Sequence, residues 1–541
     1  MFDLPRSLAL PTNEPIYEYA PGSSQRGLLK SQLAALSGDT IALPHVIDGL
    51  EDTTGERFEV RAPHDHSVTL GFAHHGRETV TQRAMDAARK ASAEWGRTSF
   101  EFRARIFSKA ADLLATDWRM RLNAATMLGQ SKTAHQAEID SACEFIDFLR
   151  FNVAFASRMV EQPISTAGIY NVVELRPLEG FVLAITPFNF TAIAGNLPAA
   201  PALLGNVVVW KPSESQALAA HYTMKLFEAA GLPPGVINLV HGDGASVAET
   251  CLAQRDLAGV HFTGSTDVFR HLWQRVGTNI RNYKSYPRLV GETGGKDFVF
   301  AHPSADFDSL VTALVRGAYE FQGQKCSAAS RAYVPRSMWP KLKDALVGEI
   351  EQLRVGDVRD FRNFMGAVIH ERSFTKLDRV IAAARADAAC TVLTGKTDRT
   401  AGWFIWPTLI EVREPSHRLL SEEFFGPVLS LFVYDDARVE ETLGIIDQTS
   451  PYALTGAIFA SDRKALAHAA DKLRQAAGNL YVNDKPTGAV VGQQPFGGAR
   501  ASGTNDKAGS ALNLLRWASP RTIKETFAPP IRVAYPFMDD S

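Results

Sequence analysis

Apolar residues recur at helical spacing along the first third of the chain. The pattern predicts helices over residues 80–95, 100–127 and 134–155, the last of which ends before Pro163. Residues 1–44 carry scattered Pro and Ser and no sustained period, so we expect them to form an extended N-terminal arm.

Between residues 178 and 278, short apolar runs alternate with helical patterns. This alternation predicts βαβ units and a parallel sheet covered on both faces. Ligands bind at the carboxyl ends of the strands in such sheets, which predicts that Asn189, Lys211, His241 and residues 263–265 line one rim. The predicted strands are 180–186, 206–211, 236–240 and 258–262, and the predicted helices are 191–204, 213–230 and 245–254.

A second α/β pattern runs from about residue 289 to 480. It predicts a helix over 306–321 and strands over 330–334 and 428–434. The segment after Arg516 is rich in β-branched and aromatic residues and Pro, and we expect it to reach another subunit. The fold class is therefore α/β.

Composition narrows the classes of protein. The chain has 541 residues, of which 45% are hydrophobic and 21% charged, with a formal net charge of −2. These values exclude wholesale disorder and argue against a general binder of nucleic acid or membrane surfaces. Residues 191–210 are apolar enough to suggest a membrane span, but Asn196, Pro198, Pro201, Gly205 and Asn206 interrupt them.

The 4 cysteines, Cys143, Cys251, Cys326 and Cys390, are far apart and match no zinc motif, so we expect no metal site and a reducing compartment. The N-terminal residues include acids and prolines and form no apolar core, which is untypical of a secretory signal. We therefore expect a soluble intracellular protein.

Two glycine-containing loops are candidate sites. Residues 262–267, Phe-Thr-Gly-Ser-Thr-Asp, join a strand to a helix whose N–H groups suit an anionic or hydroxyl-rich ligand. Phe269 and Arg270 stand where a G-x-G-x-x-G motif would have further glycines, so an ordinary N-terminal turn stays open. Glu292 lies in Gly-Glu-Thr-Gly-Gly-Lys at 291–296, where it is either a catalytic carboxylate or a cap.

Cys326 stands beside Lys325 in a polar stretch between a predicted helix and a predicted strand. A nearby positive charge or oriented N–H groups favour the reactive thiolate, so Cys326 is either a nucleophile or an exposed thiol. The other cysteines have apolar neighbours and are expected to be buried. The loops at 423–427 and 495–503 complete the set of polar or Gly-rich candidates.

Taken in order, these segments resemble the aldehyde dehydrogenase superfamily from residue 45 to the C-terminus. Residues 186–193, 492–506 and 136–140 further resemble the branch whose members oxidise L-glutamate γ-semialdehyde to L-glutamate, the second step of proline catabolism. The superfamily motifs are Pro-Phe-Asn at 187–189, Trp-Lys-Pro-Ser-Glu at 210–214, Phe-Thr-Gly-Ser at 262–265, Gly-Glu-Thr-Gly-Gly-Lys at 291–296, Gly-Gln-Lys-Cys at 323–326, Glu-Phe-Phe-Gly-Pro at 423–427 and Pro-Phe-Gly-Gly at 495–498.

The resemblance implies three catalytic residues. Cys326 is the nucleophile that forms a thiohemiacetal and then a thioester, Asn189 donates to the oxyanion, and Glu292 activates the hydrolytic water. It also implies NAD as the cofactor, because Glu214 would face a 2′-phosphate. The implied cofactor-binding residues are Lys211, Ser213, Glu214, Gly264, Ser265, Glu423 and Phe425.

The substrate of this branch carries a carboxylate and an ammonium group. The resemblance implies that Ser327 and the backbone at Gly488 and Ala489 bind the carboxylate, although some members have Ser where this chain has Ala489. Glu144 matches a residue near the substrate, and a solvated helix face is its alternative reading. The remaining implied substrate-binding residues are Phe190, Lys325 and Phe496.

The implied fold has a Rossmann-type NAD-binding domain, a second α/β catalytic domain and a β-flap for oligomerisation. We expect the NAD-binding domain at 45–162 and 178–290, the catalytic domain at 291–490 and the flap at 163–177 and 515–541. The flap implies a homodimer or a larger homo-oligomer. The chain length leaves no room for a fused proline dehydrogenase, so we expect that enzyme to be separate, in the cytoplasm or, in a eukaryote, the mitochondrial matrix.

Two other functions stay open. The first is an NAD(P)-dependent dehydrogenase for another semialdehyde or an aliphatic aldehyde, which would share Cys326, Glu292 and Asn189. A coenzyme A-acylating variant is disfavoured because Glu292 can activate water. The second is a non-catalytic binding protein on the same fold.

Overall fold

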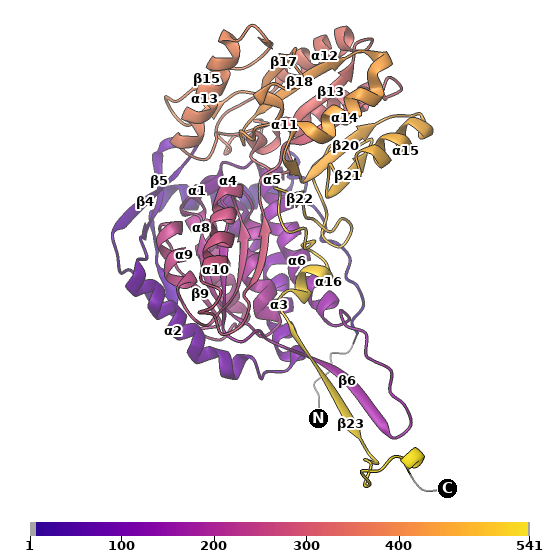
Figure 1. Ribbon diagram of the computed structural model, residues 1–541. Coiled ribbons are helices and arrows are strands. Elements are labelled where there is room, and N and C mark those ends of the chain that lie inside the picture. Colours follow the sequence, from indigo (N-terminus) through magenta and orange to yellow (C-terminus); the bar gives the residue numbers. More distant parts are fainter. Residues whose placement is uncertain (1–6, 539–541) are drawn as a thin grey trace.

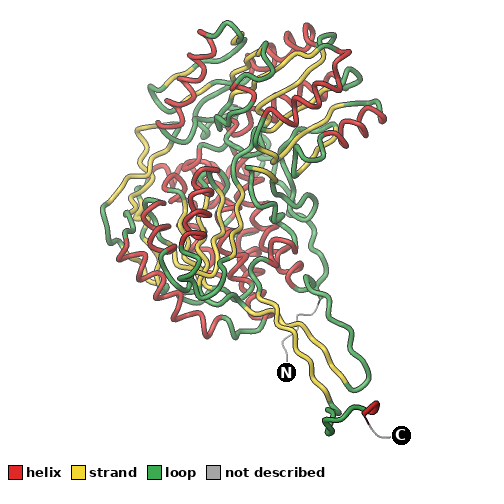
Figure 2. Tube along the Cα trace, in the orientation of Figure 1, coloured by secondary structure: helices red, strands yellow, loops and turns green. Residues whose placement is uncertain are grey.

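Two seven-stranded sheets, each flanked by helices, form the body of the protein. The computed structural model describes residues 7–538, and Figure 1 shows the two sheets with a long two-stranded ribbon projecting from the body. Residues 1–6 of the expected arm and 539–541 of the expected flap lie outside the described residues. Figure 2 shows helices packed around both sheets.

The first sheet contains the four strands predicted between residues 178 and 278, and each prediction is confirmed within two residues of its ends. Four of its strand pairs are parallel, and strand β2 adds an antiparallel pair at each of its edges. The order is β11 (Arg288–Glu292), β10 (Leu257–Thr263), β7 (Phe181–Thr186), β8 (Val207–Pro212), β9 (Ile237–Leu239), β2 (His45–Ile47) and β3 (Leu50–Asp52).

The carboxyl ends of β7, β8 and β10 meet at one edge of this sheet, as the alternation predicts. Asn189, Lys211 and residues 263–265 lie there. His241 is the exception, because its ring is fully buried and packs against the ring of His45 at 5.9 Å. His241 therefore belongs to the core of the protein and does not line the rim.

The helices that cover the first sheet are α2 (Glu78–Trp95), α3 (Phe100–Ala115), α4 (Arg119–Gln130), α6 (Phe145–Ala156), α7 (Thr191–Leu203), α8 (Ala217–Ala230), α9 (Gly244–Leu252) and α10 (Thr266–Thr278). The prediction of one helix over 100–127 is wrong, because residues 116–118 are not helical and separate α3 from α4. The hydroxyl of Thr116 donates to the carbonyl of Asp112 at 2.9 Å, and such local bonds compete with the helical ladder. Gly231 ends α8 in the left-handed conformation, as expected.

The predicted helix over 134–155 contains a π-helical segment. It consists of α5 (Ala134–Ala137), the π-helix η1 (Glu138–Glu144) and α6. The hydroxyl of Ser141 donates to the carbonyl of Ala137 at 2.8 Å, which competes for an acceptor of the regular helix. π-Helical turns inside helices are frequent at functional sites.

The second sheet holds the other predicted strands. Its helices are α11 (Phe307–Tyr319), α12 (Trp339–Gln352), α13 (Glu371–Ala386), α14 (Val439–Thr449) and α15 (Arg463–Lys472). Its strand order is β14 (Cys390–Val392), β17 (Thr408–Val412), β18 (Val428–Tyr434), β13 (Ala329–Pro335), β12 (Asp297–Ala301), β20 (Thr455–Phe459) and β21 (Asn479–Val482).

Smaller sheets complete the fold. The projecting ribbon pairs β6 (Ile169–Arg176) with β23 (Ser519–Thr526) over eight residue pairs (Figure 1). Short helix α16 (Ala511–Leu515) leads into β23. The other strands are β1 (Ile41–Leu43), β4 (Arg57–Ala62), β5 (Asp65–His74), β15 (Thr397–Asp398), β16 (Phe404–Ile405), β19 (Tyr452–Ala453) and β22 (Ala499–Arg500). In the described part of the chain, no helix is long and apolar enough to cross a membrane.

The N-terminal arm is only partly extended, because helix α1 (Ser24–Gly38) occupies its second half. Ser23 caps α1 by accepting the N–H of Arg26 on its side chain, so the expectation that the whole arm is extended is wrong. The extended part lies against the π-helix. Glu138 accepts the N–H of Tyr17 at 2.8 Å and the hydroxyl of Tyr19 at 2.6 Å.

A buried ion pair anchors this arm. The carboxylate of Glu138 is fully buried and pairs with the guanidinium of Arg119, which also donates to Glu14 of the arm at 2.6 Å. Removing one partner of a buried pair leaves an uncompensated charge in a low-dielectric environment. The fold therefore depends on this pair being complete.

We predict that Glu138→Ala lowers the free energy of unfolding by about 3–5 kcal/mol, because Arg119 loses its buried partner. Urea denaturation followed by circular dichroism measures the change. Asp267→Ala is the control, since its pair with Arg270 is exposed and contributes at most about 1 kcal/mol. Equal shifts in the two variants would contradict the prediction.

Candidate active site

Cys326 lies on the loop that connects the 3₁₀-helix η3 (Glu320–Gly323) to β13. Its side chain is partly exposed, whereas Cys143, Cys251 and Cys390 are buried as expected. Phe321 and Gln322, inside η3 at the start of the segment 320–328 that we call the nucleophile loop, have φ angles of 51° and 55°. L-Residues rarely adopt such angles and keep them only where the surroundings enforce them. The loop that carries the thiol is therefore held in a specific, strained shape.

Asn189 follows β7 and contacts the same loop. Its side-chain amide donates to the carbonyl of Gln324 at 3.0 Å, and the residue is 4% exposed. The bond brings the amide close to Cys326 although the two residues come from different sheets. An amide with one N–H bonded to the loop retains a second N–H for an oxyanion.

Glu292 ends β11 and faces the loop at 495–503. Its carboxylate accepts the N–H of Gly498 at 3.0 Å, and burial raises its pKa well above the ordinary value. The same charge helps to raise the pKa of Cys326, which places the carboxylate and the thiol within electrostatic range. A carboxyl group with a raised pKa suits general base catalysis near neutral pH.

The thiol of Cys326 sits among acidic groups. Burial raises its pKa well above the ordinary value, and Asp297, Glu292 and Glu423 raise it further. The ammonium of Lys325 pairs with Glu320 at 3.0 Å and is 4% exposed, and the backbone hydrogen bond to Cys326 lowers the pKa of the thiol against the larger effect of burial. The thiol is therefore protonated in this state.

Lys211 and Glu214 follow the first sheet at its carboxyl edge. Lys211 is 7% exposed, and burial lowers its pKa while Glu214 and Asp243 raise it. Glu214 is half exposed and lies 3.4 Å from His75. A Cβ atom at Gly244 would come within 3.3 Å of the Lys211 ammonium, so the glycine leaves room beside this charge. Ser213 donates its N–H to the carbonyl of Thr186 at 3.1 Å.

A second group of residues surrounds the start of α10. Gly264 donates its N–H to the carbonyl of Glu292 at 3.2 Å, and Ser265 caps α10 through its hydroxyl. Glu423 accepts the N–H of Gly295 at 2.8 Å, and a Cβ at Gly294 would collide with the Glu423 carboxylate at 2.1 Å. The glycines of the 291–296 loop thus permit the close approach of a carboxylate.

Phe425 completes this group. It has a φ of 57°, and its ring meets the ring of Phe188 edge to face at 5.7 Å. Phe188 directly precedes Asn189. The aromatic contact therefore joins the loop after β7 to the loop before β18.

One hydrogen bond joins the loop that carries Cys326 to the predicted anchor loop. The hydroxyl of Ser327 shares a hydrogen bond of 2.8 Å with that of Thr487, which directly precedes Gly488. Gly488 has a φ of 97°, which favours glycine, and Ala489 is partly exposed beside it. Phe496 pairs with Ala508 through two backbone bonds of 3.0 and 2.8 Å.

Glu144 is the last residue of the π-helix η1, and Phe190 precedes α7. The ring of Phe190 contacts that of Phe321 at 6.5 Å. Glu144 is partly buried, and burial raises its pKa to about 8. Lys132 and Lys325 oppose this rise and Asp140 adds to it, so Glu144 belongs to a cluster of buried charges.

Comparison with known proteins identifies the fold and the family. Residues 50–523 match the Aldehyde dehydrogenase family. The chain belongs to the aldehyde dehydrogenase family. It is 48% identical to the mitochondrial delta-1-pyrroline-5-carboxylate dehydrogenase of Dictyostelium discoideum, over 99% of this chain and 97% of that protein.

Solved structures agree with this aldehyde dehydrogenase assignment. The crystal structure of the Delta-pyrroline-5-carboxylate dehydrogenase from Mycobacterium tuberculosis bound with NAD is 55% identical, covers 100% of both chains and has a TM-score of 0.96. Proline utilization A from Bdellovibrio bacteriovorus is 29% identical with a TM-score of 0.90, and the match covers 96% of this chain and 54% of that one. The predicted α/β fold of the aldehyde dehydrogenase type is confirmed.

Three residues important to the geometry of this aldehyde dehydrogenase site went unnoticed in the sequence. Lys132 and Asp140 form a buried ion pair next to the segment that carries Asn189. The side-chain amide of Gln322 donates to the carbonyl of Ser131 and so ties the nucleophile loop to the turn after α4. The sequence does mark Asp140 indirectly, because it lies in segment 136–140, one of the segments that carry the family resemblance. Nothing in the local sequence marks Lys132.

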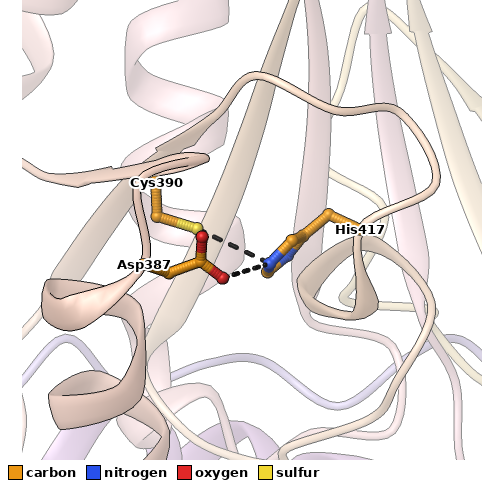
Figure 3. Close-up of side chains that lie close together, drawn as sticks. All are labelled: Asp387, Cys390 and His417. Atoms are coloured by element: carbon orange, nitrogen blue, oxygen red, sulfur yellow. Dashed lines mark hydrogen bonds and ion pairs between the residues drawn. The ribbon is translucent and has the colours of Figure 1, made fainter.

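Asp387, Cys390 and His417 form a separate cluster beside β14, an edge strand of the second sheet (Figure 3). The imidazole Nε2 of His417 lies 3.1 Å from Asp387 and 3.8 Å from the sulfur of Cys390. Its Nδ1 accepts the N–H of Leu419 at 3.1 Å, so the ring proton resides on Nε2. A metal-bound histidine donates through its other nitrogen, and this tautomer is therefore unsuited to a metal ion.

We predict that alkylation of Cys326 by iodoacetamide accelerates steadily as the pH rises, by up to about tenfold per unit, because the raised pKa keeps the thiol protonated near neutrality. Mass spectrometry of the labelled peptide measures the rate, and Cys326→Ala is the control. A plateau below pH 8 would show a lowered pKa and contradict the prediction.

Proposed function

We propose that the chain catalyses the NAD-dependent oxidation of L-glutamate γ-semialdehyde, formed from Δ1-pyrroline-5-carboxylate, to L-glutamate. This is the second step of proline catabolism. The observation that carries the proposal is likeness along the whole chain to proteins named delta-1-pyrroline-5-carboxylate dehydrogenase. The cluster of Cys326, Asn189 and Glu292 supplies the chemistry that such an oxidation requires.

In the first step, the thiol of Cys326 releases its proton to solvent, and the resulting thiolate attacks the aldehyde carbon and forms a tetrahedral thiohemiacetal. The amide of Asn189 and the backbone N–H of Cys326 donate to the resulting oxyanion. The bond from Asn189 to the carbonyl of Gln324 fixes the orientation of the amide before substrate binds. The site therefore undergoes little reorganisation when the charge develops.

When bound, NAD accepts a hydride. The collapse of the oxyanion expels this hydride from the tetrahedral carbon and leaves a thioester on Cys326. Glu292 then takes a proton from water, whose oxygen attacks the thioester carbon. Glutamate leaves and Cys326 regains its thiol form. The raised pKa of Glu292 makes it a stronger base than an exposed carboxylate.

The carboxyl edge of the first sheet fits NAD. Lys211 and Glu214 would hold the adenosine ribose together with Ser213, and Glu214 would disfavour a 2′-phosphate. Gly264 and Ser265 at the start of α10 would lie at the pyrophosphate. Glu423 would hold the nicotinamide ribose, and Phe425 would pack beside the nicotinamide.

For the substrate, we infer that Ser327 and the backbone N–H groups of Gly488 and Ala489 bind the carboxylate. The Ser327–Thr487 bond supports this role because it joins the catalytic loop to the anchor loop. Phe190 and Phe496 would enclose the aliphatic chain. Glu144 would accept the ammonium group, with Lys325 helping to balance its charge.

We also propose the assembly and location of the enzyme. The domain boundaries given above remain predictions, as does a homodimer formed through the projecting β6–β23 ribbon. Exposed apolar residues after β23 support that role, namely Phe527, Ile531, Val533, Tyr535, Phe537 and Met538. We expect a separate proline dehydrogenase to supply the substrate, in the cytoplasm or the mitochondrial matrix.

We predict strong NADH formation from NAD and Δ1-pyrroline-5-carboxylate, lower efficiency with propanal, and loss of both activities in Cys326→Ala. Absorbance of NADH measures each rate, and NADP in place of NAD tests the effect of Glu214. Equal efficiency with the two aldehydes would overturn the substrate assignment. If neither aldehyde gives NADH, a non-catalytic binding protein is favoured.

A second prediction concerns Glu144, whose pKa is raised to about 8. Only its carboxylate attracts an ammonium group, so L-glutamate should inhibit propanal oxidation more tightly as the pH rises through about 8. The inhibition constant at several pH values measures this effect. Glu144→Gln should abolish the dependence; a wild-type constant that is flat with pH would exclude Glu144 from ammonium binding.

A further inference from the structure

Lys132 occupies an unusual position beneath the site. It is fully buried in the turn after α4, and its ammonium donates to Asp140 at 2.6 Å. The same nitrogen lies 4.3 Å from the ring centre of Phe190 and 4.4 Å from that of Phe321. A desolvated cation is attracted to the faces of aromatic rings at such distances. One ammonium thus contacts both the loop after β7 and the loop that carries Cys326.

Asp140 extends this contact to the start of α7. Its two carboxylate oxygens accept the backbone N–H groups of Thr191 and Ala192, each at 2.9 Å. No side chain of α7 caps its own first turn, since Phe190 stands at the N-cap position. A carboxylate from the π-helix performs this role, and negative charge at a helix N-terminus is favoured. The position of Asn189, two residues before Thr191, is thereby tied to Asp140.

The turn that contains Lys132 also holds the nucleophile loop through its backbone. The side-chain amide of Gln322 donates to the carbonyl of Ser131 at 2.9 Å. Ser131 itself has a φ of 56° and ends α4. Residues 131 and 132 therefore contact Phe321 and Gln322, the two residues of the nucleophile loop with left-handed backbone angles.

We propose that Lys132 and Asp140 are positioning residues that set the distance between the oxyanion donor Asn189 and the nucleophile Cys326. Asp140 fixes the segment that bears Asn189, Lys132 fixes the segment that bears Cys326, and the ion pair joins the two. The inference rests on the catalytic roles proposed above. It requires no contact between the pair and the substrate.

Lys132→Met is the first test, because methionine keeps most of the side-chain length and removes the charge. We expect kcat/KM to fall by about 10²-fold with both glutamate semialdehyde and propanal, since small displacements of catalytic groups have effects of this size. The KM for NAD should not change. Lys225→Met, which removes a paired lysine from the outer face of α8, is the matched control and should retain full activity.

A double-mutant cycle with Asn189→Ala separates positioning from general damage. If Lys132 sets the distance between Asn189 and Cys326, adding Lys132→Met to Asn189→Ala should lower kcat/KM much less than Lys132→Met does in the wild type. If Lys132→Met lowers kcat/KM by the same factor in the Asn189→Ala background as in the wild type, the two residues act independently and the proposal is overturned. An unchanged kcat/KM in Lys132→Met alone would also overturn it.

Stability and activity can be separated by neutralising both partners. A single substitution leaves one buried charge unpaired and can impair folding, whereas K132M/D140N leaves none. We expect the double variant to unfold at a higher urea concentration than either single variant and to keep the low kcat/KM. Recovery of activity together with stability would mean a purely structural pair.

Failure of the substrate assignment remains distinguishable from failure of this proposal. If the wild-type enzyme oxidises propanal but not the semialdehyde, the proposed substrate is wrong. The double-mutant cycle of Lys132→Met and Asn189→Ala is then measured with propanal. If neither aldehyde reacts, the catalytic roles and the positioning role fall together.

Discussion

The strained backbone of the nucleophile loop is the constraint on which the rest of the site depends. Phe321 and Gln322 hold left-handed angles that cost on the order of 1–3 kcal/mol each. Gln322 offsets this cost while fully buried: its amide donates to the carbonyls of Ser131 and Ala367, and its oxygen accepts the N–H of Gly366. The loop is therefore shaped by contacts from both halves of the molecule.

This arrangement explains why the site lies where the two sheets meet. Asn189 follows a strand of the first sheet and Glu292 ends another, whereas Cys326 precedes a strand of the second. A nucleophile and its oxyanion donor on separate sheets need rigid cross-links to keep a reactive geometry. The bonds from Asn189 to Gln324 and from Gln322 to Ser131 supply two of them.

Much of the fold follows from the sequence, because buried parallel strands are continuous apolar runs. The strands at β7, β8 and β18 lie where the pattern predicts them, and glycine at 231 ends α8 as expected. The π-helix was not predictable from periodicity, since its seven residues are too few to shift the pattern of a long helix. The helix in the arm was missed because its buried residues are only Leu29 and Leu33.

The candidate site shows the same division. Motifs mark residues such as Cys326 and Glu292, because glycine and polar residues are conspicuous in otherwise apolar surroundings. The partner of Lys325 could not be foreseen, since proximity along the chain does not determine which carboxylate a long side chain reaches. The ammonium of Lys325 forms an ion pair with Glu320, whereas Asp297, Glu292 and Glu423 raise the pKa of the Cys326 thiol.

The acidic surroundings of Cys326 have a consequence for how the site works. Three carboxyl groups oppose ionisation of the thiol, and burial opposes it further. By the same Coulombic argument, a cation bound among these groups stabilises the thiolate. Glu423, which is proposed to hold the nicotinamide ribose, is also one of the groups that raise the pKa of Cys326, so the proposed cofactor site and the thiol share one carboxyl group.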